Sequence, residues 1–376
     1  MGKKNLLIAS DCFLPRWDGI ARFLLEIIPY LTRYYNVTVM APKFEGKMRR
    51  IPKIRLVRFR LGIITLGDYR AAVPNKKTII QEVKKADIIF TQTIGPIGKN
   101  TIEIAKKHKK KVVAYTHSIE WELVPHSAGY ITLKSLFNKI ALRIAKRLYG
   151  KCDLLMVPSL EISELLGWQG IRTKKVIVPL GTNTEEFVPP RDKAKAKELI
   201  KINPKDTVIG FSGRLGREKD IPTLYRAFRR LEKKYSNLSL LVVGKGVSEL
   251  KRMLKRRKNI MLVEFTNNIV PYLQAMDIYV LPSLTETTSI STLEAMSCGL
   301  PVIVTPVGSL PGYIQNNYNG IFFPKRDPYR LEKKLSRLIN NPGLRKTIGD
   351  NARKTVKEKF SWENTFKEMK KVFESL

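Results

Sequence analysis

The chain has 376 residues, enough for two domains of ordinary size. It carries 69 basic and 33 acidic residues, and the resulting net charge of +36 indicates a polyanionic partner: nucleic acid, an anionic membrane surface or a phosphorylated substrate. No apolar run is long enough to cross a bilayer, and three scattered cysteines exclude a disulfide or zinc framework, so we expect a reduced, cytosolic protein.

Short β-branched runs alternate with helical patterns along the chain, and the alternation starts afresh in the second half. Strands are predicted at 5–10, 36–41, 87–91, 111–116 and 153–158, and again at 207–212, 238–243, 260–263, 277–282 and 301–305. Helical stretches such as 20–33 and 131–150 lie between or after them. Strands separated by helices are joined by right-handed crossovers, which predicts a parallel sheet in each half.

The segment 176–190 joins the two series and ends in a double proline. We therefore predict two Rossmann-like, doubly wound α/β domains, at 1–185 and 186–376, with the last helix (about 361–376) returning to the first domain. Ligands of such sheets bind at the carboxyl ends of the strands. A substrate is therefore expected in a deep cleft that the two domains face.

The stretch 283–305 places two carboxylates, Glu286 and Glu294, around the predicted start of a helix. Thr288 or Ser289 can cap this helix, and its free N–H groups could then receive a phosphate. Carboxylate oxygens suit the neighbouring hydroxyls of a sugar or ribose ring. The alternative is purely structural: Ser291-x-x-Glu294 would be a capping box and Glu286 a solvated loop acid.

A glycine-containing basic turn follows the strand 207–212. In SGRLGREKD, Gly213 permits close approach of the backbone to a ligand, and Arg214 and Lys219 can clamp a diphosphate. Such a turn can also be an ordinary solvated loop. A second glycine turn, VVGKG at 242–246, is by itself a weak indication of nucleotide binding.

With these motifs in order, the chain resembles the family 4 retaining glycosyltransferases of the GT-B fold over nearly its whole length. The matching pieces are Asp11-x-Phe13-x-Pro15 with Gly19-Ile20, AYTHS, VIVPLGTNTEEF, SGRLGREKD, VVGKG, ETTSISTLEAMSCGLPVIVT, Val307-Gly308 and Asn319-Gly320. The Glu-x7-Glu pattern followed by EAMSCGLPV is highly specific for this family.

The resemblance implies a nucleotide-sugar donor and four catalytic residues: His117, Arg214, Lys219 and Glu286. Arg214 and Lys219 would bind the diphosphate and stabilise the charge on the leaving group. Glu286 would hold hydroxyls of the transferred sugar, which His117 would approach from the first domain. Further donor-binding residues are implied: Gly19, Gly213, Thr288, Ser289, Ile290 and Glu294, the last on the ribose hydroxyls.

The implied chemistry needs no side-chain nucleophile, because the leaving phosphate helps to deprotonate the acceptor on the face it leaves. No cofactor and no metal are expected, and a UDP-sugar is favoured over a GDP-sugar. His117 and His126, with acids between them, lack a metal-binding spacing. The chain departs from the family pattern at three places. Asp18-Gly19 replaces the usual Gly-Gly, and Leu180-Gly181-Thr182-Asn183 replaces the usual Asn-Gly-x-Asp. Thr287-Thr288 replaces the more usual small residue and Phe, so the family pattern does not indicate which sugar is transferred.

The acceptor is inferred from the distribution of charge in the first domain. Residues 131–150 form a basic amphipathic pattern without acids, with Ile131, Leu136, Ile140, Ile144 and Leu148 mainly four apart. An ordinary helix packed on its sheet is the alternative. A second basic cluster occupies 43–60. We expect membrane contact through Arg49, Arg50, Lys53, Arg55, Lys139, Arg143, Lys146 and Arg147.

The sequence therefore predicts a retaining hexosyltransferase at the cytosolic face of a membrane that glycosylates a lipid, similar to diacylglycerol and phosphatidylinositol glycosyltransferases. A soluble glycan or small-molecule acceptor is the first alternative. A nucleic-acid-binding protein is the distant one, because the basic residues are not interleaved with stacking aromatics. Flotation with anionic liposomes beside a gel shift with random RNA would distinguish these classes.

Overall fold

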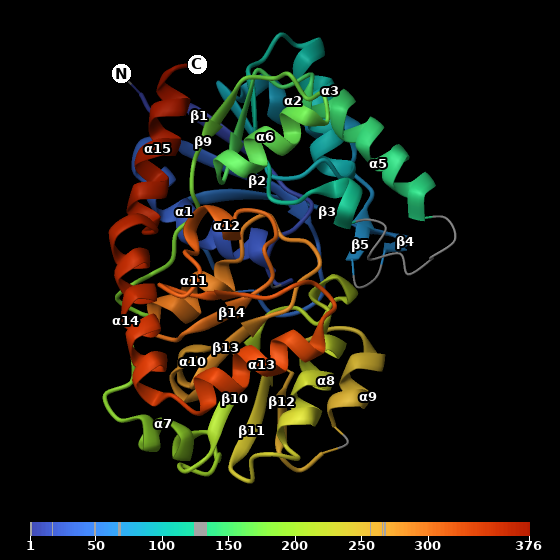
Figure 1. The fold of residues 1–376 in the computed structure, drawn as a ribbon. Coiled ribbons are helices and arrows are strands. Elements are labelled where there is room, and N and C mark those ends of the chain that lie inside the picture. The colour runs from blue at the N-terminus through green and yellow to red at the C-terminus, as the bar shows by residue number, and fades with distance from the viewer. Residues whose placement is uncertain are drawn as a thin grey trace. The chain divides into compact units, whose positions relative to one another are not determined.

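The computed structural model describes residues 2–16, 18–48, 50–66, 69–123, 134–255, 257–264, 266 and 268–376. It divides into two compact units (Figure 1). Unit 1 comprises Met1–Leu180 and Trp362–Leu376, and unit 2 comprises Gly181–Ser361. In the described part of the chain, no helix is both long and apolar enough to cross a membrane.

Unit 1 is built on a seven-stranded parallel sheet in the order β3-β2-β1-β6-β7-β8-β9. Its strands are β1 (Asn5–Ala9), β2 (Asn36–Pro42), β3 (Ile54–Phe59), β6 (Ile88–Thr91), β7 (Val112–Tyr115), β8 (Leu154–Val157) and β9 (Lys175–Ile177). An antiparallel hairpin, β4 (Leu61–Leu66) and β5 (Tyr69–Ala72), follows β3. Strands β6, β7 and β8 are buried at every residue, as expected for a sheet covered on both faces.

One face of this sheet packs against α2, α3, α5 and α6, whose buried residues share a single core cluster. These helices are α2 (Lys76–Lys85), α3 (Pro96–Lys107), α5 (Lys134–Tyr149) and α6 (Leu160–Trp168). Two further helices, α1 (Gly19–Tyr34) and α15 (Trp362–Glu374), contact each other and lie side by side in Figure 1. Phe366 of α15 stacks on Tyr30 and Tyr34 of α1, with ring centroids 5.4 and 5.5 Å apart.

Unit 2 contains a six-stranded parallel sheet in the order β12-β11-β10-β13-β14-β15. Its strands are β10 (Thr207–Ser212), β11 (Leu238–Val243), β12 (Ile260–Val263), β13 (Ile278–Leu281), β14 (Val302–Val304) and β15 (Ile321–Phe322). The helices are α7 (Lys193–Leu199), α8 (Ile221–Leu231), α9 (Ser248–Leu254), α10 (Val270–Ala275), α11 (Ile290–Ser297), α12 (Leu310–Tyr313), α13 (Pro328–Ile339) and α14 (Pro342–Lys359).

Both sheets are doubly wound, which confirms the predicted fold class. In each sheet the chain runs outward from a central strand and then returns to that strand's other side. The strand order therefore reverses between β1 and β6 in unit 1 and between β10 and β13 in unit 2. Ligands of doubly wound sheets bind at such switch points, beyond the carboxyl ends of the strands.

Several edge elements, β3 among them, are not predicted from the sequence. The sequence of β3, IRLVRF, includes two arginines, Arg55 and Arg58, and departs from strict apolar–polar alternation at the adjacent Leu56 and Val57. Arg58 is nevertheless half-buried, and its guanidinium donates to the backbone oxygens of Pro42 and Leu14. An arginine that satisfies buried carbonyls cannot be distinguished from a solvated one by pattern alone.

Candidate functional site

The switch point of unit 2 brings together the loops that follow β10 and β13. The Tyr279 hydroxyl of β13 donates to the Ser212 oxygen at the end of β10 (3.1 Å) and lies 2.9 Å from the Ser291 hydroxyl of α11. Burial raises the pKa of Tyr279, so this hydroxyl stays protonated. The end of one strand and the start of α11 are thereby fixed to each other.

Glycines join the loops after β10 and β11. The Gly213 N–H donates to the Val243 oxygen (3.0 Å), and the Leu215 N–H donates to the Lys245 oxygen (2.9 Å). A Cβ at Gly244, where φ is +154°, would lie 1.8 Å from the Gly213 oxygen. The weak glycine signal of 242–246 therefore has a structural cause, the close approach of two backbones.

Arg214 is held by a carboxylate, that of Glu218, for which the sequence predicts no role. Its guanidinium donates to Glu218, which is buried, four residues further along. The Glu218 backbone oxygen in turn accepts from the Leu284 N–H (2.8 Å), in the loop after β13. Glu218 thus positions the predicted diphosphate-binding arginine and fastens its turn to the neighbouring loop.

Lys219 and Glu286 form a direct ion pair across 67 residues of sequence. The Ser283 hydroxyl also donates to this Glu286 oxygen, at 2.6 Å. The Lys219 side chain is 17% exposed and that of Glu286 only 8%, so both charges lie in a largely desolvated place. The alternative of a solvated loop acid at Glu286 is therefore wrong, and two predicted site residues touch each other.

The N-terminus of α11 is capped by Ser289, whose hydroxyl accepts from the Thr292 N–H at 3.2 Å. Ile290 is the first helical residue. The alternative capping box starting at Ser291 is not formed, since Ser291 instead meets Tyr279. Thr288 lies 3.3 Å, hydroxyl to hydroxyl, from Ser309 of the loop after β14. Glu294, in the second turn of the helix, is buried.

The loop after β14 packs against the Glu286 loop from the other side. A Cβ at Gly308, where φ is +56°, would lie 2.1 Å from the Glu286 backbone oxygen. The Thr305 hydroxyl donates to the Ser283 oxygen and the Ser309 N–H to the Thr287 oxygen. These contacts explain Val307-Gly308 in structural terms: only glycine fits beside the carboxylate-bearing loop.

In unit 1, Asp18 and Asp11 both act as helix caps. The Asp18 carboxylate accepts from the Ile20 and Ala21 N–H groups (3.1 and 2.9 Å), and the space around Gly19 is open. Asp11, buried after β1, accepts from Thr93 and from the first N–H groups of α3. Burial raises the Asp11 pKa, and the motif residue is accounted for by this cap.

His117 follows β7 and is held by neighbours from three elements. Its Nε2 lies 2.9 Å from the Gln92 amide oxygen, and its ring stacks on Tyr115 and meets the edge of Phe23. Burial lowers the pKa of His117 to about 3, so the imidazole is neutral near pH 7. A neutral ring can exchange hydrogen bonds with hydroxyl groups but brings no charge to a ligand.

The predicted membrane-binding residues are distributed over separate surfaces. Arg49 lies outside the described residues, as do Ile131 and His126. Arg50 and Lys53 are exposed, whereas Arg55 forms an ion pair with buried Glu82. Because β3 is at one edge of the sheet and α5 connects β7 with β8, the 43–60 cluster and α5 are separated by several strands.

Helix α5 exposes a stripe of large apolar side chains. Leu136, Ile140 and Ile144 are 53%, 46% and 44% exposed, while Leu148, predicted in the same stripe, is buried. Lys139, Arg143 and Lys146 are exposed on the same helix, and Arg147 pairs with Glu103 of α3 (3.1 Å). The opposite face of α5 packs into the core.

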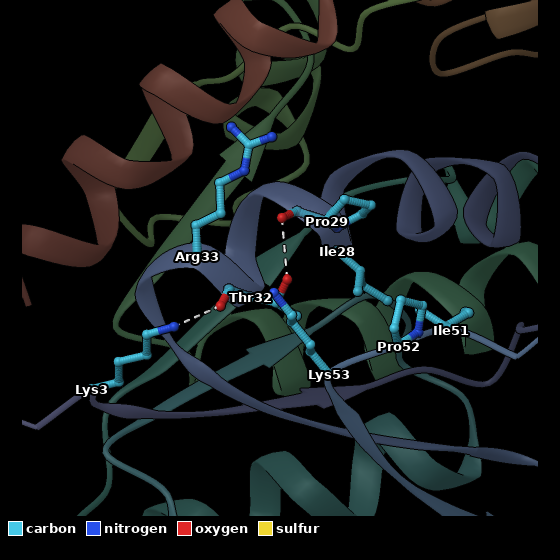
Figure 2. A pocket seen from close by; sticks show the side chains of 8 residues that line it. All are labelled: Lys3, Ile28, Pro29, Thr32, Arg33, Ile51, Pro52 and Lys53. Carbon is cyan, nitrogen blue, oxygen red and sulfur yellow. Dashed lines mark hydrogen bonds between the residues drawn. The ribbon is translucent and has the colours of Figure 1, made fainter.

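A hollow of about 490 Å³ lies on unit 1, at the end of the sheet opposite to the carboxyl ends of its strands (Figure 2). Its lining residues are Lys3, Ile28, Pro29, Thr32, Arg33, Ile51, Pro52 and Lys53. Lys3 precedes β1 and Lys53 precedes β3, so the hollow is at the amino ends of the strands. It contains none of the predicted donor-site residues. No group of three or more His, Cys, Asp and Glu within the described ranges could hold a metal ion.

Two family models match the chain: Glycosyltransferase Family 4 over residues 17–186 and Glycosyl transferases group 1 over residues 192–355. The chain is a glycosyltransferase composed of these two domains. It is 27% identical to the uncharacterized glycosyltransferase MJ1069 of Methanocaldococcus jannaschii over the whole of both chains. It is 26% identical to the alpha-monoglucosyldiacylglycerol synthase of Acholeplasma laidlawii, over 93% of this chain and 92% of that protein.

Solved structures agree on the fold of this glycosyltransferase. Anabaena Alr3699/HepE in complex with UDP-glucose superposes with a TM-score of 0.81 at 18% identity, covering 99% of this chain and 100% of that one. Sucrose-phosphate synthase from Thermosynechococcus elongatus gives 0.79 at 18% identity, covering 100% and 99%. At this identity the likeness establishes the GT-B fold only.

Proposed function

We propose that this glycosyltransferase moves a hexose from a nucleotide sugar, with retention of configuration, to a lipid at the cytosolic face of a membrane. The observation that carries the donor half is the Lys219–Glu286 pair beside Arg214 at the switch point of unit 2. The observation that carries the acceptor half is the exposed apolar stripe of the basic helix α5.

The ion pair suggests how a nucleotide sugar is received. A diphosphate is a stronger partner for Lys219 than one carboxylate, so its arrival moves the ammonium from Glu286 to the phosphate oxygens. Glu286 then has its acceptor oxygens available for hydroxyls of the sugar. As the glycosidic bond to the diphosphate breaks, Lys219 and Arg214 stabilise the negative charge that develops on the leaving oxygen.

The remaining donor contacts come from α11 and the β10 turn. Backbone groups at Thr288, Ser289 and Ile290 face the phosphates or sugar, Gly213 permits close approach, and Glu294 receives the ribose hydroxyls. UDP-glucose is bound by the Anabaena protein of similar fold, which supports a UDP-sugar as the first donor to test. The two cations take the place of a bound metal in this scheme.

The lipid acceptor is supported by the Acholeplasma relative, a glycolipid synthase by name that aligns over almost the whole chain. The apolar stripe of α5 fits the acyl boundary of a bilayer, and its lysines and arginines fit anionic headgroups. Other relatives are named for inositol phosphate and capsular polysaccharide, so a soluble acceptor is the competing outcome.

The decisive experiment measures flotation with anionic vesicles and hexose transfer to diacylglycerol in the same preparation. Replacing Leu136, Ile140 and Ile144 together by serine is expected to abolish flotation and to lower lipid glycosylation at least tenfold. Leu199→Ser, an equally drastic change of a residue that is 71% exposed on α7, is the matched control and leaves both unchanged. Wild-type protein that stays unbound at low salt would overturn the lipid acceptor and leave the soluble one.

A further inference from the structure

A buried carboxyl group, Glu120, lies three residues after His117 and is used by no step above. It is the first helical residue after β7, in a segment that the structure describes as helical over 120–123. Its Oε1 accepts from the Tyr149 hydroxyl of α5 at 2.6 Å and from the Ser118 hydroxyl at 3.1 Å. Its Oε2 is buried and has no hydrogen-bond partner among the described residues.

The residues around Glu120 are firmly packed. Ile119 and Trp121, its neighbours in sequence, are 4% and 6% exposed and belong to the same core cluster as Tyr149. Tyr149 itself is almost completely buried. The segment that carries His117 is therefore held at two points, by Gln92 at the imidazole and by α5 at Glu120.

We propose that Glu120 is a positioning residue for His117, whose carboxyl group fastens the segment 116–120 to α5. This inference rests on the proposed hexose transfer and on the role that the family resemblance implies for His117, which would approach the transferred sugar. Without the Tyr149 bond, Glu120 loses its hydrogen bond to α5, and without the Ser118 bond it loses its link within the segment. The imidazole is then held less firmly where it meets its partners. A displacement of about 1 Å can cost a hundredfold in rate.

The fastening suits a neutral acid better than a carboxylate. Burial raises the pKa of Glu120 to about 7, although the hydrogen bonds from Tyr149 and Ser118 oppose this shift. Among the described residues, no charged side chain contributes to the pKa of Glu120. Above pH 7 a negative charge would lie on a carboxylate whose Oε2 has no donor, which weakens the packing of the segment.

The titratable groups described around Glu120 and its partner Tyr149 have pKa values far from 7. Burial raises the Tyr149 pKa well above its ordinary value and that of Cys152, just after α5, to about 12. His117, on the same segment, has its pKa lowered to about 3 by burial. Of these four described groups, Glu120 is the one whose pKa lies between 5 and 9.

The test compares Glu120→Gln, Glu120→Ala and Tyr149→Phe in the full-length enzyme. Wild-type kcat is expected to fall as pH rises from 6 to 8. The glutamine variant keeps an acceptor oxygen for both hydroxyls and should show a flat profile near the wild-type value at pH 6. The alanine variant is expected to lose about tenfold to a hundredfold in kcat at every pH, with the donor KM unchanged. Tyr149→Phe, which leaves the Ser118 bond, should lie between these two.

Glu103→Gln is the matched control, because it makes the same change at another carboxylate that contacts α5, through Arg147, yet lies on α3. Its pH profile should match the wild type. A wild-type profile retained in Glu120→Gln, at equal folded fraction by circular dichroism, overturns the proposal. Equal activity in the glutamine and alanine variants overturns it as well.

A spectroscopic readout separates this inference from the proposed function. Infrared difference spectra between pH 6 and 8 should show the loss of one protonated carboxyl band that is absent in Glu120→Gln. If the wild type transfers no hexose but shows this band, the proposed function fails and the buried neutral acid stands. If the band is missing while transfer proceeds normally, the inference on Glu120 fails alone.

Discussion

At the carboxyl ends of the two sheets, buried ionisable side chains are stabilised in opposite ways: as ion pairs in unit 2 and as neutral groups in unit 1. In unit 2, Lys219 pairs with Glu286 and Arg214 with Glu218, so charges are kept and opposed to one another. In unit 1, His117 and Glu120 have no charged partner among the residues that the structure describes, and burial shifts both pKa values towards the neutral form. Both sheets have the same winding, so the difference arises from the loops and not from the fold.

This contrast suggests a division of labour. A site that must receive a diphosphate benefits from cations, and the paired carboxylates keep those cations satisfied until the ligand arrives. A site that must handle hydroxyl groups needs donors and acceptors without net charge, because an unpaired buried charge is costly. The four predictions below test each half of this comparison, beginning with the largest effect.

Removing one partner of the charged pair should have the greatest effect. Lys219→Ala or Glu286→Ala is expected to lower kcat by two to three orders of magnitude, since each removes several kcal/mol of transition-state stabilisation, about 1.4 for each factor of ten. Lys251→Ala, which breaks an ion pair with Glu264 elsewhere in unit 2 (2.6 Å), is the control and should leave kcat unchanged. Near-normal kcat in a folded Lys219→Ala enzyme would refute the donor site.

Glu120 should produce the next largest effect, on stability. Its pKa is about 7 in the folded protein against an ordinary value of 4.5, so the folded state binds a proton more tightly. The stabilisation is complete below pH 4.5 and is lost as pH rises through 7, a total of about 3 kcal/mol. Urea unfolding of wild type and Glu120→Gln should therefore diverge between pH 5 and 8, with the variant gaining relative stability. A constant difference would show that Glu120 is not a buried neutral acid.

The basic side chains of α5 should contribute less, at most about 1 kcal/mol each on an anionic surface. Replacing Lys139, Arg143 and Lys146 by serine is expected to weaken vesicle binding at 50 mM salt far more than at 500 mM, because exposed charges are screened. Replacing Arg50, Lys53 and Arg55 by serine should weaken vesicle binding less, because Arg55 is already paired with Glu82. Equal losses would mean that both clusters face the membrane.

Chelation should produce the smallest effect. If Arg214 and Lys219 neutralise the diphosphate, transfer rates should be the same within error with and without EDTA. Loss of activity with EDTA that is restored only by added divalent metal would refute neutralisation of the diphosphate by these two side chains alone. The charged end of unit 2 would then need a cation beyond its own side chains.

Much of this architecture follows from local pattern. Strands such as β6 and β8 are buried on both faces and therefore appear as continuous apolar runs, which is why the doubly wound fold could be predicted. The acids at 286 and 294 and a cap at 288 or 289 follow from short spacings around one helix. The missed β3 shows the limit, because Arg58 satisfies carbonyls of Pro42 and Leu14 that only the folded chain brings near.

What the tertiary structure alone decided are the partners of the site residues. Lys219 meets Glu286 across 67 residues, Tyr149 meets Glu120 across 29, and Asp11 caps a helix that begins 85 residues later. The last helix joins unit 1 through Thr365, whose hydroxyl donates to the Pro179 oxygen at 2.7 Å. Hydrophobic period determines which residues are buried, whereas strand order determines which loops become neighbours, and strand order is a property of the whole chain.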